Sequence, residues 1–316
     1  MSDDAHMNRD LIGSAVQSNV MTQTIHDGAP VWTTRRLLIW TTRYFEKKRL
    51  GHPRLAAEML LAHVLGVPRL KLYMDSDRPA SELERAAFRN LVERAVAHEP
   101  VDYLVGCSPF FSMLLEVNPT VFIPRPCTEM LVEHVVQHAR RTAGFHAPLV
   151  ADVGTGCGAI AVAVAKHVPH SHVIATDLSA QAMEVACRNA KAHGVEDRVE
   201  FRCGKLLEPL GAHRVRFLLS NPPYVSDEQW LQLPTHVKHY EPETALRGGV
   251  DGLRYLGLLI AGAREHLEHP GQLVLEIAST QKDAVLQMAQ KAMGLANACI
   301  LADHEGFPRM LVADTL

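Results

Sequence analysis

The sequence of 316 residues has few of the features that mark a specialised class of protein. Its longest uninterrupted apolar run is Ala159–Ala165, whereas a membrane-spanning helix needs about 20 residues, so we expect no membrane association. The six cysteines are scattered without a Cys-x-x-Cys pair, which indicates isolated reduced thiols rather than a disulfide framework. The acidic opening segment has no apolar core and does not resemble a signal peptide, so we expect a cytoplasmic location.

Neither a strong charge of one sign nor a metal-ligand pattern is present. The 32 Lys and Arg residues against 35 Asp and Glu give a formal net charge of −3, so we expect no direct nucleic-acid partner. His167, His170 and His172 lie close together, but no nearby cysteine or carboxylate completes a zinc set, and we expect no metal site. With 47% hydrophobic and 21% charged residues, the composition is typical of a soluble globular chain.

The length and the residue patterns predict two domains joined by a linker. Helical periodicity begins at Thr33 and again after Pro53, and a capping box of Ser81 and Glu84 predicts the start of a third helix. Apolar residues on both sides of Asn118-Pro119 predict a β-hairpin with its turn there. We therefore expect a mobile tail (1–30), a helical domain (31–104), a β-hairpin linker (105–126) and a larger second domain (127–316).

Strands and helices alternate from Thr128 onward, which predicts an α/β domain with a mostly parallel sheet and helices on both faces. Two strand-like runs close the chain, Ala298–Ala302 and Met310–Ala313. Only a short segment separates them, so we expect this last pair to be antiparallel.

A glycine-rich loop follows the first strand of this domain, in the segment Asp152-Val-Gly154-Thr-Gly156-Cys-Gly158-Ala159. Open α/β sheets bind ligands at this carboxyl edge, and glycine lets the backbone approach them closely. The spacing matches the nicotinamide dinucleotide fingerprint, and it equally fits the loop of methyltransferases that use S-adenosylmethionine. A tight strand–helix turn without a ligand is the third interpretation.

Asp177 ends the second strand, 23 residues after Gly154. A carboxylate at this place can accept hydrogen bonds from both hydroxyls of an adenosine ribose. The alternative role is a helix N-cap, for which Ser179 is the better candidate. Asp177 therefore indicates an adenosyl cofactor without distinguishing NAD from S-adenosylmethionine.

The segment Asn221-Pro222-Pro223-Tyr224 follows the fourth strand and favours the methyltransferase interpretation. Its two prolines stiffen the chain, so the Asn221 side chain and the Pro222 carbonyl point in fixed directions. These oxygens can accept both hydrogens of a planar NH₂ group while Tyr224 packs on its face. The delocalised lone pair of such a group is a poor nucleophile until those hydrogens are bonded. The alternative is a stiff turn without a chemical role.

Further segments resemble the HemK-type protein glutamine-N5 methyltransferases, from about residue 33 to residue 316. The resemblance implies a Rossmann-like class I methyltransferase fold with a seven-stranded sheet, its last strand antiparallel, behind a helical substrate-recognition domain. It is nearest to the branch that methylates the glutamine of the Gly-Gly-Gln motif in class 1 peptide chain release factors. The segments that carry it are Arg54-Leu-Ala-Ala-Glu58-Met-Leu60-Leu61, Pro100-Val-Asp-Tyr103-Leu-Val-Gly106, Phe122-Ile-Pro124-Arg125-Pro126-Cys-Thr128-Glu129, His239-Tyr240-Glu241-Pro242, Ala245-Leu246 and Gly248-Gly249-Val-Asp251-Gly252-Leu253.

Three other functions remain alternatives: a glutamine methyltransferase for a ribosomal large-subunit protein, a nicotinamide-dependent oxidoreductase, and a binding module without turnover. The chain also departs from the family at Cys127, where relatives usually carry Glu or Asp, and at Lys205, where most carry an acidic residue beside the adenine ring. Phe110 and Phe111 either close over the substrate or form the core of the hairpin.

The resemblance also implies a set of site residues. The catalytic residues are Asn221, Pro222 and Tyr224, and Pro223 joins them in binding the substrate amide. S-adenosylmethionine contacts Asp152, Gly154, Thr155, Gly156, Cys157, Gly158, Asp177, Leu206 and Asn221.

Overall fold

A computed structural model describes residues 31–142 and 147–316, so the tail expected over residues 1–30 lies outside the described residues. The chain divides into two compact units, with the boundary between Val92 and Glu93. The domain limits drawn from the sequence differ from this boundary by about a dozen residues and stay a prediction.

The first unit is helical, as its periodicity predicts. The capping box is formed: the Ser81 backbone N–H donates to Glu84 Oε2 at 2.8 Å, and the Glu84 N–H donates to Ser81 Oγ at 3.2 Å. Apolar side chains such as Phe45, Leu60 and Leu72 are buried in its core. Its helices are α2 (Thr34–Lys47), α3 (Pro53–Leu65), α4 (Lys71–Met74) and α5 (Glu82–Val96), the last of which crosses the boundary between the units.

The second unit is built on a seven-stranded sheet with the order β10-β11-β9-β6-β3-β4-β5. Strand β11 is antiparallel to both of its neighbours, whereas β9, β6, β3, β4 and β5 pair in parallel. This confirms the expected fold class. The strands are β3 (Leu149–Val153), β4 (His172–Asp177), β5 (Val199–Cys203), β6 (Val215–Ser220), β9 (Leu267–Glu276), β10 (Leu295–Ala302) and β11 (Pro308–Thr315).

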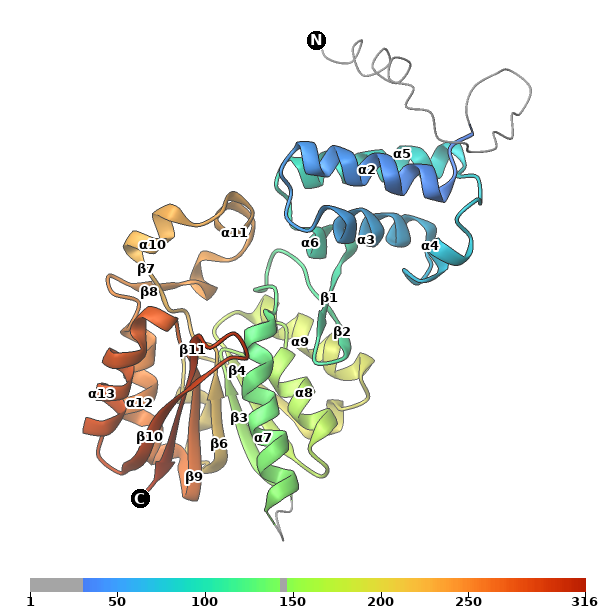
Figure 1. Cartoon of the computed structure of the whole chain (residues 1–316). Helices are drawn as coiled ribbons and strands as arrows, with labels where there is room; N and C mark the ends of the chain where they lie inside the picture. The colour runs from blue at the N-terminus through green and yellow to red at the C-terminus, as the bar shows by residue number, and fades with distance from the viewer. Residues whose placement is uncertain (1–30, 143–146) are drawn as a thin grey trace. The chain divides into compact units, whose positions relative to one another are not determined.

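Helices cover both faces of this sheet, because successive strand residues point to opposite sides and both sides are apolar. In β3, Val150 belongs to the core on one face and Ala151 to the core on the other. Figure 1 shows α7 (Glu129–Arg141), α8 (Ala159–His167) and α9 (Ala180–Ala192) on the first face, with α12 (Arg254–His266) and α13 (Lys282–Lys291) on the second. The carboxyl edge of the parallel strands therefore stays free for a site.

The hairpin lies earlier in the chain than the sequence predicts. After α6 (Val101–Val105), strands β1 (Cys107–Phe110) and β2 (Met113–Glu116) pair around the turn Phe111-Ser112. Both turn residues have positive φ, 46° and 60°, as the tight turn of a two-residue hairpin requires. The prediction of a turn at Asn118-Pro119 is wrong, because Asn118 instead orders a loop by accepting a hydrogen bond from the Thr120 N–H at 2.9 Å.

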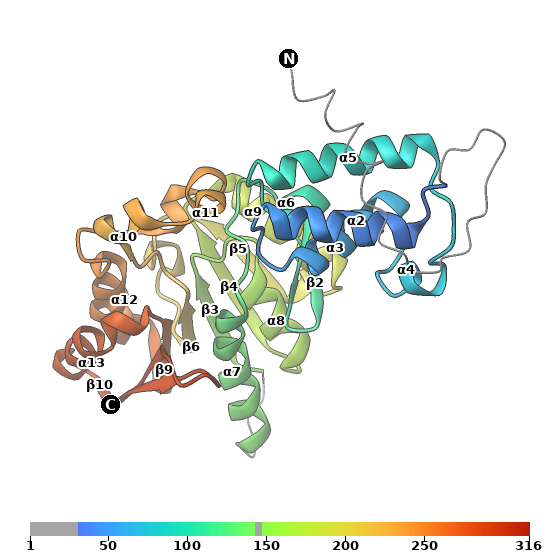
Figure 2. The ribbon, with the colours of Figure 1, turned by 45° about the horizontal axis from the view of Figure 1, so that its top comes forward.

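A further segment after β6 lies beyond the carboxyl ends of the central strands in both views (Figures 1 and 2). Strand β7 (Val225–Ser226) leads into α10 (Asp227–Gln232) and α11 (Thr235–Tyr240), and β8 (Arg247–Gly249) pairs with β7 on its return. These short elements were not predicted from the sequence. In the part of the chain that the structure describes, no helix has both the length and the apolar character needed to cross a membrane.

Candidate active site

A cavity of about 530 Å³ opens at the carboxyl edge of the sheet. Its volume lies within the range of about 300–1,000 Å³ that small-molecule sites occupy. Segments far apart in the sequence line it, and they bring together most of the predicted site residues. These are Gly154, Thr155, Gly156, Cys157, Asp177, Leu206, Asn221, Pro222, Pro223 and Tyr224.

The glycine loop presents bare backbone to this cavity. Gly154 and Gly156 have φ values of 75° and 57°, a region that favours glycine, and a Cβ atom on either would project into open space. Gly158 has a different role, because a Cβ there would lie 3.0 Å from Ala186 Cβ. It lies outside the cavity lining and lets the start of α8 pack closely against α9.

Asp152 lies behind the loop and is fully buried. Its Oδ2 accepts hydrogen bonds from Thr155 Oγ1 at 2.6 Å and from the Ala161 N–H at 3.0 Å. Burial raises the pKa of this carboxyl to about 7. Asp152 does not line the cavity, so the structure places it as a support of the loop.

Asp177 lines the cavity at the end of β4. Its Oδ2 accepts a hydrogen bond from the Gly156 N–H at 2.9 Å, and its Oδ1 accepts one from the Ser179 N–H at 2.8 Å. Ser179 itself caps α9 by accepting a hydrogen bond from the Ala182 N–H at 3.1 Å, as predicted. A carboxylate has about four acceptor positions, so Asp177 can still accept hydrogen bonds from a ligand.

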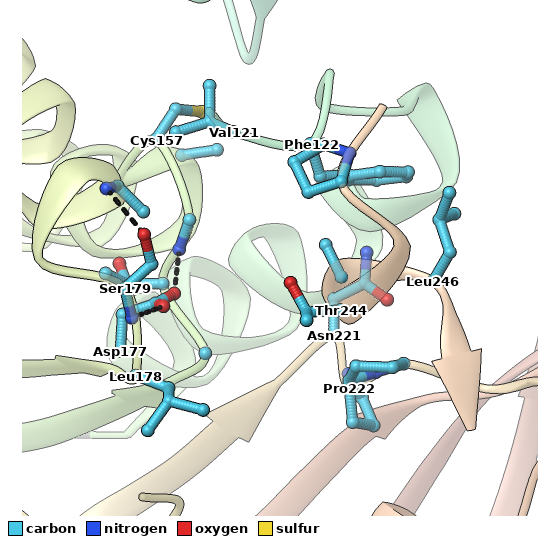
Figure 3. A pocket seen from close by; sticks show the side chains of 18 of the residues that line it. Val121, Phe122, Cys157, Asp177, Leu178, Ser179, Asn221, Pro222, Thr244 and Leu246 are labelled. Atoms are coloured by element: carbon cyan, nitrogen blue, oxygen red, sulfur yellow. Dashed lines mark hydrogen bonds between the residues drawn. The ribbon is translucent and has the colours of Figure 1, made fainter. Parts of the chain in front are cut away.

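Asn221 and Pro222 lie across the cavity from Asp177 (Figure 3). The Asn221 Nδ2 donates a hydrogen bond to Thr128 Oγ1 at 3.1 Å, so the Oδ1 atom of the same carboxamide points away from Thr128. The Tyr224 hydroxyl donates to Glu276 Oε1 at 3.0 Å, and burial raises the pKa of Tyr224 well above its usual range. Sequence reasoning did not assign Thr128 or Glu276 to the site.

Among the lining residues that were not predicted are Val121, Phe122, Thr244 and Leu246, which Figure 3 shows with the predicted ones. They belong to two segments separated by more than a hundred residues. An ion pair between Arg125 and the buried Glu241 joins these segments, and Glu241 Oε2 also accepts a hydrogen bond from the Ile123 N–H at 3.2 Å. One indication that these segments belong to the site was available in the sequence: both contain motifs that resemble those of the family.

Phe110 and Phe111 do not line the cavity. Phe110 is only 1% exposed in the core on the α7–α9 face, and Phe111 packs edge-on against the His167 ring at 4.9 Å. The geometry therefore fits the alternative that both residues belong to the core of the hairpin. It gives no support to the expectation that Phe110 and Phe111 close over the substrate.

Lys205 and Leu206 do line the cavity, after β5. Leu206 adopts a positive φ of 49°, and its carbonyl accepts a hydrogen bond from Thr176 Oγ1 at 3.1 Å, which fixes this turn beside the end of β4.

The fold and the site define an S-adenosylmethionine-dependent methyltransferase. The family model described as "Methyltransferase small domain" matches residues 124–236, and the one described as "PrmC N-terminal domain" matches residues 36–106. The bare glycine backbone beside the Asp177 carboxylate fits this cofactor, because a Cβ on Gly154 or Gly156 would fill the space that the loop leaves open.

Curated relatives give the particular family. The chain is 38% identical to "Release factor glutamine methyltransferase" of Geobacter sulfurreducens over 281 residues, which covers 89% of this chain and 96% of that protein. It is likewise 38% identical to the protein of the same name from Rhodopirellula baltica, covering 89% and 95% of the two chains. The protein of that name from Xylella fastidiosa is 39% identical over 82% of this chain and 92% of its own. The chain belongs to the release factor glutamine methyltransferase family, which confirms the resemblance.

Proposed function

We propose that this chain transfers a methyl group from S-adenosylmethionine to the side-chain amide N5 of the glutamine in the Gly-Gly-Gln motif of class 1 peptide chain release factors. The observation that carries the proposal is the orientation of Asn221. Because its Nδ2 donates to Thr128, its Oδ1 is the atom that a substrate amide can meet in the cavity that Asp177 and the glycine loop also line. The names of the relatives supply the substrate.

The first half of the site binds the cofactor. Gly154 and Gly156 give it backbone without side chains, and Asp177 accepts hydrogen bonds from the ribose hydroxyls. Leu206 packs beside the adenine ring, next to the exposed Lys205. When bound, S-adenosylmethionine supplies the methyl group as an electrophilic substituent of its sulfonium.

The second half of the site holds the glutamine amide. Asn221 Oδ1 and the Pro222 carbonyl accept its two N–H hydrogens, while the Tyr224 ring packs against its face. Bonding these hydrogens increases the electron density on nitrogen and favours attack on the methyl group. The N–C bond would form as the S–C bond breaks, the sulfur would keep the electron pair, and one of the two N–H protons would then leave to solvent. The stiff Pro222-Pro223 turn fixes both acceptors, so catalysis comes from positioning and from polarising the amide.

The remaining assignments follow from the same function. The helical domain at residues 31–104 recognises the release factor, the hairpin linker follows it, and the domain at 127–316 carries the chemistry. The reaction takes place in the cytoplasm, where release factors act in translation termination. No direct contact with nucleic acid or membrane is needed for it.

The proposal is tested by incubating the purified chain with a release factor and S-adenosylmethionine carrying a labelled methyl group. Mass spectrometry should place the label on the glutamine of the Gly-Gly-Gln motif, and a release factor with that glutamine replaced by glutamate should take up none. Calorimetric titration should show binding of S-adenosylhomocysteine and none of NAD. Label on a ribosomal large-subunit protein but not on the release factor would overturn the substrate assignment, and binding of NAD alone would overturn the reaction class.

A further inference from the structure

A buried carboxylate lies next to the Asn221–Tyr224 turn, and the proposed function gives it no role. Glu276 is the last residue of β9 and is 0% exposed. Its Oε1 accepts hydrogen bonds from the Tyr224 hydroxyl at 3.0 Å and from Cys127 Sγ at 3.5 Å. Burying a carboxylate costs free energy unless its oxygens are hydrogen-bonded, so a core position at this edge would normally hold an apolar residue.

Thr128 connects this carboxylate to the substrate half of the site. Burial raises the pKa of Glu276, and the interaction with the Thr128 side chain opposes that shift, so the two side chains are neighbours. The same Thr128 hydroxyl accepts the hydrogen bond from Asn221 Nδ2 at 3.1 Å. Thr128 therefore lies between Glu276 and the residue that meets the substrate amide.

The hydrogen bond between Asn221 and Thr128 determines which end of the Asn221 carboxamide is left for a ligand. A carboxamide donates through its nitrogen and accepts through its oxygen. Because Nδ2 donates to Thr128 Oγ1, Oδ1 is the end that remains for a donor in the cavity.

We propose that Thr128 and Glu276 are positioning residues of the methyl transfer: Thr128 holds the Asn221 carboxamide with its oxygen toward the substrate amide, and Glu276 holds Tyr224 of the same turn. The inference rests on the proposed function, because Asn221 is taken as the acceptor for the glutamine N–H. Through its bond to the Tyr224 hydroxyl, Glu276 fixes the aromatic ring of the same turn as well.

Thr128→Val and Thr128→Ser form a matched pair that tests the first step. Valine has nearly the same shape but has no hydroxyl, so we expect kcat for the release factor to fall about 10- to 100-fold, as is typical for residues that orient a catalytic group. Serine keeps the hydroxyl and should restore kcat to within about threefold of the wild type. The affinity for S-adenosylhomocysteine should stay within about threefold in both variants, because neither touches the cofactor half of the site.

A double-mutant cycle with Asn221→Ala separates positioning from a general structural effect. If Thr128 acts through Asn221, the variant with both Thr128→Val and Asn221→Ala should be no slower than the variant with Asn221→Ala alone. Glu276→Gln tests the second residue: the Tyr224 hydroxyl loses its carboxylate acceptor, so we expect kcat to fall while the affinity for S-adenosylhomocysteine stays within about threefold. An unchanged kcat in a folded Glu276→Gln variant would refute its positioning role. Thermal unfolding checks that each variant is folded. If Glu276→Gln does not fold, the comparison of Thr128→Val with Thr128→Ser still tests the proposal.

The outcomes for the two proposals are distinct. A wild-type chain that transfers no label to the release factor refutes the proposed function. A wild-type chain that transfers label, together with multiplicative losses in the double variant or an unchanged kcat in Thr128→Val, refutes only the positioning role.

Discussion

Replacing Asp177 with alanine separates the cofactor-binding role of this carboxylate from its role in the fold. The side chain holds the backbone N–H groups of Gly156 and Ser179, and its remaining acceptor positions face the cavity. Hydrogen bonds to a charged acceptor contribute about 1.5–3 kcal/mol, so the loss of the ribose contacts should raise the Kd for S-adenosylhomocysteine about 10- to 150-fold.

The same substitution should also lower the free energy of unfolding, by about 1–2 kcal/mol, because two backbone N–H groups lose a charged acceptor. Ser179→Ala is the matched control. It removes the cap of α9, which costs about 1 kcal/mol of stability, but it leaves the Asp177 carboxylate in place.

Isothermal titration with S-adenosylhomocysteine and urea unfolding measure the two effects on the same samples. We expect Asp177→Ala to change both quantities and Ser179→Ala to change only stability. An unchanged Kd in Asp177→Ala would show that the carboxylate only holds the loop. A Kd raised equally in both variants would show that loop order, rather than a ribose contact, sets the affinity.

Four further predictions concern other parts of the site. Asn221→Ala should lower kcat about 10²- to 10³-fold in the methyl-transfer assay and leave the affinity for S-adenosylhomocysteine within about threefold, since one polarising contact is lost from the transition state. Lys205→Asp should bind S-adenosylhomocysteine at least as tightly as the wild type in calorimetry, since the family resemblance implies an acidic residue at this position of the cavity lining, and loss of binding would give Lys205 an unforeseen role. Gly158→Ala should unfold at lower urea concentration, because the new Cβ would lie 3.0 Å from Ala186 Cβ. The pKa of Asp152 is raised to about 7 in the fold, so its proton favours the native state, and this contribution is lost as pH rises from about 4 to about 7. Relative to Asp152→Asn, the wild-type free energy of unfolding should therefore fall over that interval and change little above it, which urea titrations at successive pH values measure.

The alternating sheet and helices were predictable from sequence because the information is local. Strands such as Val215–Ser220 are short apolar runs, and capping boxes and glycines mark the adjacent turns. The hairpin turn was placed wrongly because Asn118-Pro119 is a strong turn signal, whereas Phe111-Ser112 is not. A bulky residue rarely adopts a positive φ, so nothing in its identity indicated the true turn.

The long-range contacts of the site were not predictable in the same way. Asn221 and Thr128 are 93 residues apart, and Cys127 and Glu276 are 149 apart. One signal was present for Glu276: it is a single carboxylate within the otherwise apolar run Leu273–Ile277. Buried charges that persist in such places need hydrogen-bonding partners, so the carboxylate itself indicates polar neighbours.

The two halves of the site are therefore held in physically different ways. The cofactor half is built mainly from segments that are close in sequence. Asp177, whose carboxylate accepts a hydrogen bond from the Gly156 N–H, follows Gly156 by 21 residues. In the substrate half, hydrogen bonds between distant segments hold Asn221 and Tyr224 in place. A substitution in the cofactor half alters the local backbone, so it should change the affinity for the cofactor. A substitution in the substrate half alters the orientation of the Asn221 acceptor, so it should change kcat. Loss of turnover at unchanged affinity in Thr128→Val, beside loss of affinity in Asp177→Ala, would show that the two functions depend on separable parts of the fold.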